Sequence, residues 1–281
     1  MAIRIITDSA SDVTAELAKE LSITVVPLSI QFGPHTWFDG VSITRADFYE
    51  LLLTGEHHPT TAQPSPEAFL HQFEQAKAAG DEVLCLTLSS RLSGTFQSAN
   101  IAKAMCEYEP IHIVDSLSAT GGMQLLLHRA CAMREDGASA TDIAAALEQL
   151  KGRIRVYAVI DTLEYLHKGG RLSAGAAAVG TAVRLKPIVE VRDGEIRVVS
   201  KAFGLAAADK QLLRLITEHP ADATYPVYHL YTDRPVRTES FLAALADKGI
   251  VPAELRSVQL GAALGTHIGP GALAFAYIDA E

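Results

Sequence analysis

Residues 83–115 read VLCLTLSSRLSGTFQSANIAKAMCEYEPIHIVD, and this stretch decides the fold class. Val83–Leu88 is a short apolar run typical of a buried strand, and Gly94–Cys106 reads as a helix. Ile111–Val114 is a second short apolar run. A strand, a helix and a strand in this order form a βαβ unit, whose two strands lie parallel in one sheet. The stretch therefore predicts an α/β fold.

The same alternation continues on both sides of this unit. Further strands are expected at Ile3–Thr7 and Thr24–Ile30, and further helices at Thr14–Leu21, Thr44–Leu53, Ser65–Gly80 and Ser139–Gly152. One more helix is expected after the strand Ile111–Val114, ending at about Arg134. Residues 1–152 are therefore predicted to form an N-terminal α/β domain, in which helices cover both faces of a mostly parallel sheet.

The second half of the chain has a different pattern. Ile188–Arg192 and Ile196–Ser200 flank Asp193-Gly194, a dipeptide typical of a two-residue type I′ hairpin turn. Four more elements are expected: strands at Arg155–Ile160, Val227–Tyr231, Leu255–Gln259 and Ala272–Ile278. Residues 153–281 are therefore predicted to form a C-terminal α/β domain with a mixed sheet and helices.

Composition excludes several classes of partner. The chain has 281 residues, with 33 acidic and 24 basic side chains and a net charge of -9. No Lys/Arg cluster offsets this charge, so neither nucleic acid nor an anionic membrane surface is an expected partner. No run of 18 apolar residues and no signal peptide is present, which predicts a soluble, cytoplasmic protein without stable membrane insertion.

The sequence motifs contain little that indicates catalysis or a metal. GxSxG, HExxH and Walker A patterns are absent, and the three cysteines form no CxxC pair. Gly269–Ala274 matches a dinucleotide-binding pattern, but too little chain follows it to complete a βαβ unit. Asp8, Asp12 and Asp115 follow strands beside serines, where capping of the next helix is favoured over metal binding.

Hydroxyl side chains gather in loops that are expected to join strands to helices. These loops are Thr60–Ser65, Ser89–Thr95 and Asp115–Thr120. In an open parallel sheet such loops meet at the carboxyl ends of the strands, where ligands bind and helix N-termini present free N–H groups. Taken singly, Ser65, Ser93 and Ser118 are ordinary helix caps. Together, the three loops predict a site for a carboxylate or another anion.

Two basic residues are further candidates. His267 lies between glycines in residues 264–271, LGTHIGPG, where the backbone is free to approach a ligand closely. Arg171 follows Gly169-Gly170 and either interacts with a helix C-terminus, as His167 and Lys168 are expected to do, or faces the site.

Seven motifs, in order along nearly the whole chain, resemble those of the DegV family, whose studied members act as fatty-acid-binding (FakB) proteins for a bacterial fatty acid kinase. The motifs are ITDSASD from Ile6, TTAQPSP from Thr60, LSSRLSGTFQSA from Leu88, VDSLSATGG from Val114, DTLEYLHKGGRLS from Asp161, LKPIV from Leu185 and GTHIGPGALA from Gly265.

This resemblance implies two α/β domains with an acyl chain between them, the C-terminal one covering the chain. It implies that Thr61 and Ser93 hold the ligand carboxylate, that the Gly94 and Thr95 amides complete the pocket, and that His267 lies at the carboxylate end. Ala174–Ala178 and Gly180 would then either make room for the acyl chain or pack helices closely. The protein would not be an enzyme itself: with no cofactor or metal, it would present a long-chain fatty acid to a separate fatty acid kinase, which forms an acyl phosphate.

Departures from the family pattern keep two alternatives open. Ala62 stands where Ser is common, Arg91 stands where Gly often does, and Ser200–Leu205 is poor in the basic residues expected where a kinase docks. The first alternative is a carrier or sensor of another lipid-like carboxylate without a kinase. The second is a serine acyl hydrolase in which Ser93 attacks and His267 is the base, although the nucleophile elbow is missing.

Overall fold

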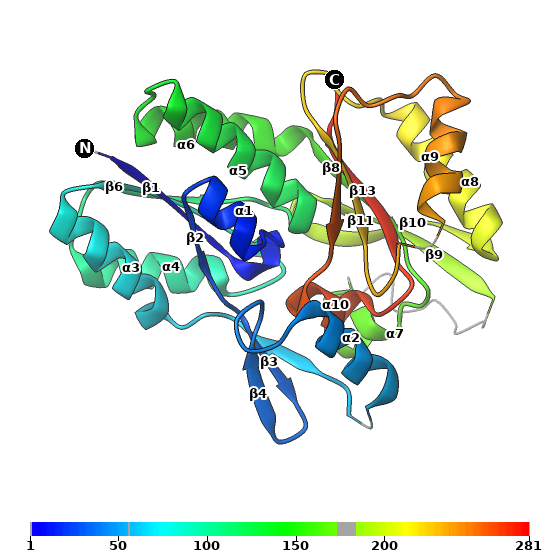
Figure 1. Ribbon diagram of the computed structural model, residues 1–281, viewed down its shortest axis with the longest axis horizontal. Helices are drawn as coiled ribbons and strands as arrows, with labels where there is room; N and C mark the ends of the chain where they lie inside the picture. The colour runs from blue at the N-terminus through cyan, green and yellow to red at the C-terminus, as the bar shows by residue number, and fades with distance from the viewer. Residues whose placement is uncertain (1, 56, 173–183, 236, 281) are drawn as a thin grey trace.

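The structure is a computed structural model that describes all residues except 1, 56, 173–183, 236 and 281 (Figure 1). The first half contains β1 (Ile3–Asp8), η1 (Ser9–Ser11), α1 (Ala15–Glu20), β2 (Ile23–Val26), β3 (Ser29–Phe32), β4 (His35–Phe38), α2 (Arg45–Thr54), β5 (Thr60–Ala62), α3 (Pro66–Ala79), β6 (Glu82–Thr87), α4 (Thr95–Cys106), β7 (Ile111–Asp115), α5 (Thr120–Glu135) and α6 (Ala140–Leu150). The second half contains η2 (Lys151–Arg153), β8 (Ile154–Val159), α7 (Glu164–Lys168), β9 (Leu185–Arg192), β10 (Glu195–Phe203), α8 (Leu205–Glu218), β11 (Val227–Tyr231), α9 (Thr238–Ala246), β12 (Leu255–Gln259), α10 (Ala262–Ile268) and β13 (Leu273–Ile278).

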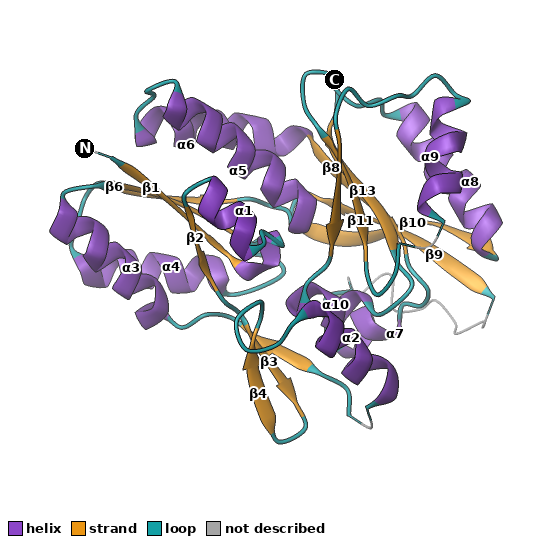
Figure 2. Ribbon diagram, viewed as in Figure 1, coloured by secondary structure: helices purple, strands orange, loops and turns teal. Residues whose placement is uncertain are grey.

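The first sheet is parallel throughout, in the order β2-β1-β6-β7. Its two faces are covered by different helix pairs, α3 with α4 and α5 with α6 (Figure 2). Phe69 and Phe73 of α3 pack against one face, and Ile143 and Leu147 of α6 belong to the core on the other. This confirms the predicted parallel sheet with helices on both faces.

The second sheet is mixed, in the order β10-β9-β8-β13-β11-β12. β11 and β12 run parallel, and the other neighbours are antiparallel. The predicted hairpin is confirmed: Asp193 and Gly194 have φ values of 52° and 83°, as a type I′ turn requires. Helices α8 and α9 cover the outer face of this sheet.

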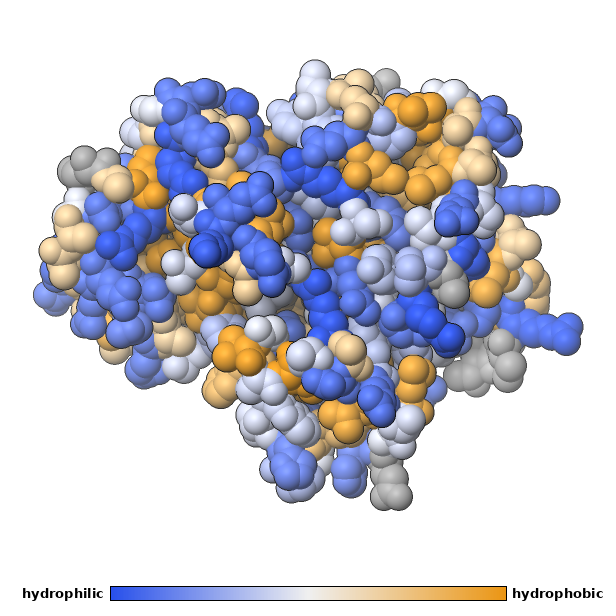
Figure 3. Space-filling view, in the orientation of Figure 1, coloured by the Kyte–Doolittle hydropathy of each residue, from blue (hydrophilic) through white to orange (hydrophobic). Residues whose placement is uncertain are grey.

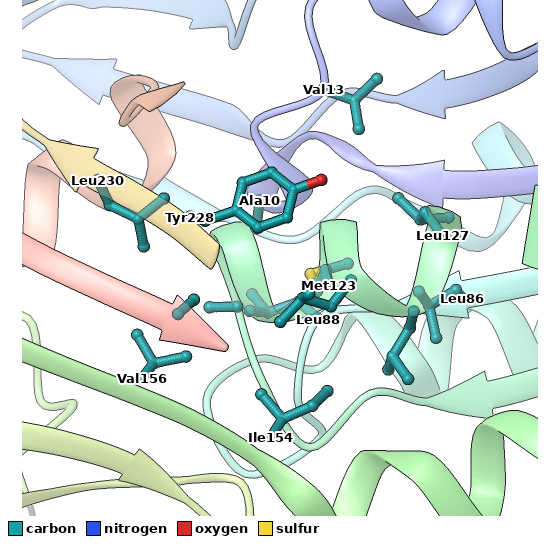
Figure 4. Packing of buried hydrophobic residues seen from close by; sticks show 14 of the residues in the cluster. Ala10, Val13, Leu86, Leu88, Met123, Leu127, Ile154, Val156, Tyr228 and Leu230 are labelled. Carbon is teal, nitrogen blue, oxygen red and sulfur yellow. The ribbon is translucent and has the colours of Figure 1, made fainter. Parts of the chain in front are cut away.

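One hydrophobic core joins the two sheets. Figure 4 shows Leu86 of β6, Met123 of α5, Val156 of β8 and Leu230 of β11 in a single cluster. Because α5 packs against strands of both sheets, it forms a shared layer between them. The two halves are therefore placed against each other by buried apolar contacts, which sets the geometry of any site between them.

A third sheet was not predicted. Its order is β4-β3-β5, and its neighbouring strands are all antiparallel. The expected single strand at Thr24–Ile30 is wrong, because the chain forms β2 and β3 with Pro27-Leu28 between them. Proline lacks the N–H that a continuous strand would use in its ladder. Helix α10 packs beside this small sheet and beside α2.

The surface and the cysteines agree with the composition. Hydrophilic residues cover most of the face seen in Figure 3, and hydrophobic residues form smaller separate groups. Among the described residues, the longest apolar helices fall short of what a membrane crossing needs. Cys85, Cys106 and Cys131 are free thiols in the interior.

Candidate ligand-binding site

An apolar cavity lies between the two large sheets. About 880 Å³ of space free of protein atoms lies in this cavity and at its opening to solvent together. Leu28, Leu88 and Leu92 line it from the first half of the chain, and β8, β9, β10, β11 and β13 line it from the second. The polar residues among its described lining are Thr61, Thr120, Ser93, Arg171 and His267. An apolar cavity with few polar groups is the usual form of a small-molecule site.

Thr61 and His267 meet although they are far apart in the sequence. Thr61 lies on β5 and His267 near the end of α10, and Thr61 Oγ1 lies 2.8 Å from His267 Nε2. The other ring nitrogen, Nδ1, is buried and has no hydrogen-bond partner among the described residues. Gly169 lies against the ring: a Cβ at that position would stand 2.1 Å from Nδ1, so only glycine fits there.

The environment of His267 keeps its ring neutral at neutral pH. Burial lowers its pKa to about 4, and the positive charge of Arg171 and the nearby His58 act in the same direction. A neutral imidazole carries one N–H. With that proton on Nε2, the ring donates to Thr61 Oγ1 and leaves the Thr61 hydroxyl proton free to donate into the cavity.

Ser93 has a similar arrangement at the start of α4. Its hydroxyl accepts a hydrogen bond from the Thr95 backbone N–H at 3.3 Å and lies 2.9 Å from Thr95 Oγ1. Thr95 is fully buried and does not line the cavity, so it orients Ser93 from behind. Gly94 also lies off the cavity, and a Cβ there would collide with the Gln63 side chain.

The remaining predicted residues lie in different places. Arg171 lines the cavity, and its guanidinium donates to the carbonyl oxygens of Leu92 at 3.0 Å and Gly169 at 2.6 Å. Ser118 is buried at the turn before α5 and does not line the cavity. The structure thus brings Thr61, Ser93, Arg171 and His267 to one cavity, and it places Gly94, Thr95 and Ser118 behind its wall. The alanine-rich Ala174–Ala178 and Gly180 lie outside the described residues.

All three aspartates accept from backbone N–H groups, but of the three only Asp8 caps the helix that follows it, the short η1. Asp8 accepts from the N–H groups of Ala10 at 3.0 Å and Leu88 at 2.7 Å, and Asp115 accepts from those of Ser90 and Leu117 at 3.1 Å each. Asp12 accepts from the Gly261 N–H at 2.7 Å. Within the part of the chain that the structure describes, no group of three or more His, Cys, Asp or Glu side chains is arranged to hold a metal ion.

The geometry does not assemble a catalytic Ser–His pair. The His267 ring is hydrogen-bonded to Thr61, whereas the recorded partners of the Ser93 hydroxyl belong to Thr95. A serine nucleophile needs its base within hydrogen-bond reach. This arrangement fits binding better than acyl hydrolysis.

Sequence reasoning missed two parts of the site. It predicted no helix around His267, where it saw only glycines that free the backbone, whereas residues 262–268 form α10. It also missed Thr120, which lines the cavity with φ at 46° and a buried side chain. The sequence did contain a signal for Thr120. It is the last hydroxyl residue of the Asp115–Thr120 loop, and the following Gly121-Gly122 indicates that the helix begins close to other parts of the chain.

Comparison with known proteins finds one family over almost the whole chain. The model of a family described as "Uncharacterised protein, DegV family" matches residues 2–280. A DegV domain-containing protein of Caldanaerobacter subterraneus is 37% identical over 271 residues, which is 96% of each chain.

Solved structures give the same result. One, described as fatty acid binding of a DegV family protein from Thermus thermophilus, has a TM-score of 0.89 and 31% identity, and covers 99% of this chain and 100% of that one. Another, described as DegV, a fatty acid binding protein from Bacillus subtilis, has a TM-score of 0.84 and 28% identity, with 99% of both chains covered.

Proposed function

This chain belongs to the DegV family, and from that premise we propose that it binds a long-chain fatty acid in the cavity and presents the carboxylate to a separate kinase. The observation that carries the proposal is the pairing of an apolar cavity wall with two oriented hydroxyl groups, Thr61 and Ser93.

The head-group end supplies neutral donors. In the tautomer with the proton on Nε2, His267 donates to the Thr61 hydroxyl oxygen, and the Thr95 N–H donates to that of Ser93, which leaves both hydroxyl protons free to turn to a ligand carboxylate. Hydrogen bonds to a charged acceptor contribute about 1.5–3 kcal/mol each. The Arg171 guanidinium adds a positive charge at the same cavity.

The apolar walls supply most of the affinity. Burying about 14 methylene groups at about 0.8 kcal/mol each gives roughly 11 kcal/mol of transfer free energy. Association costs of about 4–15 kcal/mol are subtracted from this gain and from the head-group hydrogen bonds. The acyl chain therefore provides the driving force, and the hydroxyl groups fix which end of the ligand faces Ser93.

We further propose that the chain divides into domains at 1–152 and 153–281, with the ligand between them. Ala10, Leu88 and Ala119 line the cavity from the first domain, and Val156 and Leu230 line it from the second. The kinase step follows from the family resemblance. With an ATP-using kinase as its partner, we propose that the protein acts in the cytoplasm.

Replacing both hydroxyl residues tests the binding proposal. Thr61→Ala with Ser93→Ala should lose co-purifying lipid and weaken fatty acid binding by about 10²- to 10⁴-fold, as expected for two hydrogen bonds to a carboxylate. Thr60→Ala is the matched control, because Thr60 is an exposed neighbour on β5 that does not line the cavity. Unchanged lipid content by mass spectrometry in a folded double variant would contradict the proposal.

A second assay separates presentation from simple carriage. Purified protein loaded with fatty acid is mixed with a bacterial fatty acid kinase and ATP, and acyl phosphate is trapped with hydroxylamine. Product formation supports presentation. A loaded protein that yields no product would favour a carrier or sensor without a kinase. Ester hydrolysis by the wild type that Ser93→Ala abolishes would revive the hydrolase alternative.

A further inference from the structure

Helix α10 borders two different hollows of the molecule. Ala263, Leu264, His267 and Ile268 line the apolar cavity. Gly261, which precedes the helix, lines a polar cleft together with Asp12 and Asp39. The start of α10 therefore lies among buried acidic residues, and its end carries the histidine that contacts Thr61.

Two carboxylates from the first half of the chain hold the start of α10. Asp12 Oδ1 accepts from the Gly261 N–H at 2.7 Å. Asp39 accepts from the Ala262 N–H at 3.0 Å through one oxygen and from the Ala263 N–H at 3.3 Å through the other. Both carboxylates are more than nine-tenths buried. The Tyr49 hydroxyl adds a further hydrogen bond next to this helix start, because it donates to the Leu260 carbonyl at 3.1 Å.

These contacts satisfy the donors that an isolated helix leaves free. The first N–H groups of a helix have no partner within the helix, and side-chain acceptors there stabilise it. A seven-residue helix containing Gly265 is too short to be stable by itself. The position of α10 is therefore set by what holds its two ends.

The carboxylates are buried at a cost. Burial raises the pKa of Asp12 to about 7, although Arg45, Thr120 and the Gly261 N–H favour its charged form. Burial also raises the pKa of Asp39, against the hydrogen bonds from Ser9, Ala262 and Ala263. Asp8 lies in the same cluster, and its charge adds to the repulsion with Asp12 and Asp39. Residues that are costly to bury and that converge on one helix point to a specific task.

We propose that Asp12 and Asp39 are positioning residues for the ligand carboxylate: by holding the start of α10, they place His267 at hydrogen-bonding distance from Thr61. This inference rests on the proposed fatty acid site. A helix transmits a displacement at its start directly to its end, about 9 Å away over six residues. Displacement of about 1 Å at His267 breaks its contact with Thr61 and releases the hydroxyl from its orientation.

The test compares a carboxylate ligand with a neutral one. Asp39→Asn replaces one acceptor oxygen by an NH₂ group, which cannot accept from the Ala263 N–H. We expect this variant to bind a pyrene-labelled fatty acid at least 10-fold more weakly, while the corresponding pyrene-labelled fatty alcohol changes less than 3-fold. Asp12→Ala, which removes the acceptor of the Gly261 N–H, should act in the same direction. Tyr49→Phe should give a smaller effect in a variant that keeps all three carboxylates.

Asp47→Asn is the matched control. Asp47 borders the same cleft but is exposed, and it contacts Thr44 at the start of α2 rather than α10. It should leave both affinities unchanged. Equal weakening of acid and alcohol, or an unchanged affinity for the acid in folded Asp39→Asn, would overturn the positioning role.

A ligand-free measurement separates this inference from the proposed function. The ¹⁵N chemical shifts of the His267 ring, assigned with His267→Asn, should move in Asp39→Asn and stay in place in Asp47→Asn. If wild-type protein binds neither probe, the proposed function fails, and the ring shifts still decide whether Asp39 positions His267. Ring shifts identical to wild type in Asp39→Asn would reject the link between the two ends of α10.

Discussion

The apolar cavity and the polar cleft both border α10, yet they differ completely in charge. The cleft is lined by Asp12, Glu16, Asp39 and Asp47, with Arg45 as the cation among its described residues. The described lining of the cavity contains no carboxylate, and its charged group is Arg171. A short helix thus separates an acidic region from a region suited to an anionic head group.

Burial affects both regions in the same physical way. It lowers the pKa of His267 to about 4 and raises that of Asp12 to about 7, because in both cases it disfavours the charged form. The ligand end of the cavity therefore uses neutral donors rather than a histidine cation. Buried acids are therefore absent from the described lining of the cavity, and those of the cleft accept from backbone N–H groups of α10.

The largest expected effect comes from placing an acid in the cavity. Ser93→Asp would put a negative charge beside the ligand carboxylate, and two such charges about 4 Å apart repel by about 4 kcal/mol at an effective dielectric constant of 20. Fatty acid binding should weaken by roughly 10³-fold, and a fatty amine should become a ligand. Val41→Asp, which adds the same charge at an exposed position bordering the cleft, serves as the control. Equal fatty acid affinities of Ser93→Asp and Val41→Asp would contradict the view that the cavity, unlike the cleft, excludes negative charge.

Crowding the helix between the regions should have the next largest effect. A Cβ at Gly265 would stand 2.6 Å from the Phe48 ring and 2.8 Å from the Tyr49 hydroxyl. Gly265→Ala should lower the free energy of unfolding by about 1–3 kcal/mol, since overpacking outweighs the gain in helix propensity. Urea denaturation measures this. Gly152→Ala has open space around it and should change stability little; a stabilised Gly265→Ala would show that α10 is not held tightly.

The pH dependence of stability sharpens the comparison at the acidic end. The pKa of Asp12 rises from 3.8 to about 7 on folding, so the folded state binds more protons between these values. The stability that this group contributes is therefore fully present below pH 3.8 and is lost as the pH rises from there through about 7. Asp12→Asn removes this dependence, so the wild type should lose stability relative to the variant by up to about 1.4 kcal/mol per pH unit between pH 5 and 7.

Thermal or urea unfolding of both proteins at several pH values measures that difference. A constant difference between wild type and Asp12→Asn from pH 5 to 8 would mean that Asp12 stays ionised in the fold.

The smallest effect is expected for exposed charges. Glu164 and Lys168 pair at 2.6 Å on α7, and both side chains are about half exposed. Exposed pairs of this kind contribute about 0.3–0.5 kcal/mol. Glu164→Gln should leave the urea midpoint nearly unchanged. This result would show that a charged side chain affects stability mainly where it is buried. A loss above about 1 kcal/mol would contradict this view.

The regular elements were largely predictable because their signals are local. Ser65-Pro66 and Gly80 delimit α3 as expected, and Asp193-Gly194 forms the predicted turn. Apolar runs such as Val83–Leu88 identified strands of the parallel sheet. These predictions needed only periodicity, capping and turn chemistry over a few neighbouring residues.

The parts of the site that sequence reasoning missed depend on partners far away in the chain. Helix α10 forms from a glycine-rich segment because Asp12 and Asp39, more than 220 positions earlier, accept from its first N–H groups. Thr60–Ala62 becomes a strand because it pairs with β3. The hydroxyl-rich loops indicated Thr61 and Ser93 as site residues. The hydrogen bond between Thr61 and His267 could not be predicted from them, because it forms only when distant parts of the chain meet in the fold.

The contact between Thr61 and His267 spans 206 positions of the sequence. During synthesis on a ribosome, Thr61 emerges long before His267, since the chain lengthens by about 5–20 residues per second. The nascent first half therefore exposes Leu28, Leu88 and Leu92 without the strands that later face them. The fatty acid can bind only after nearly the whole chain has been made, so it cannot assist the earliest folding steps.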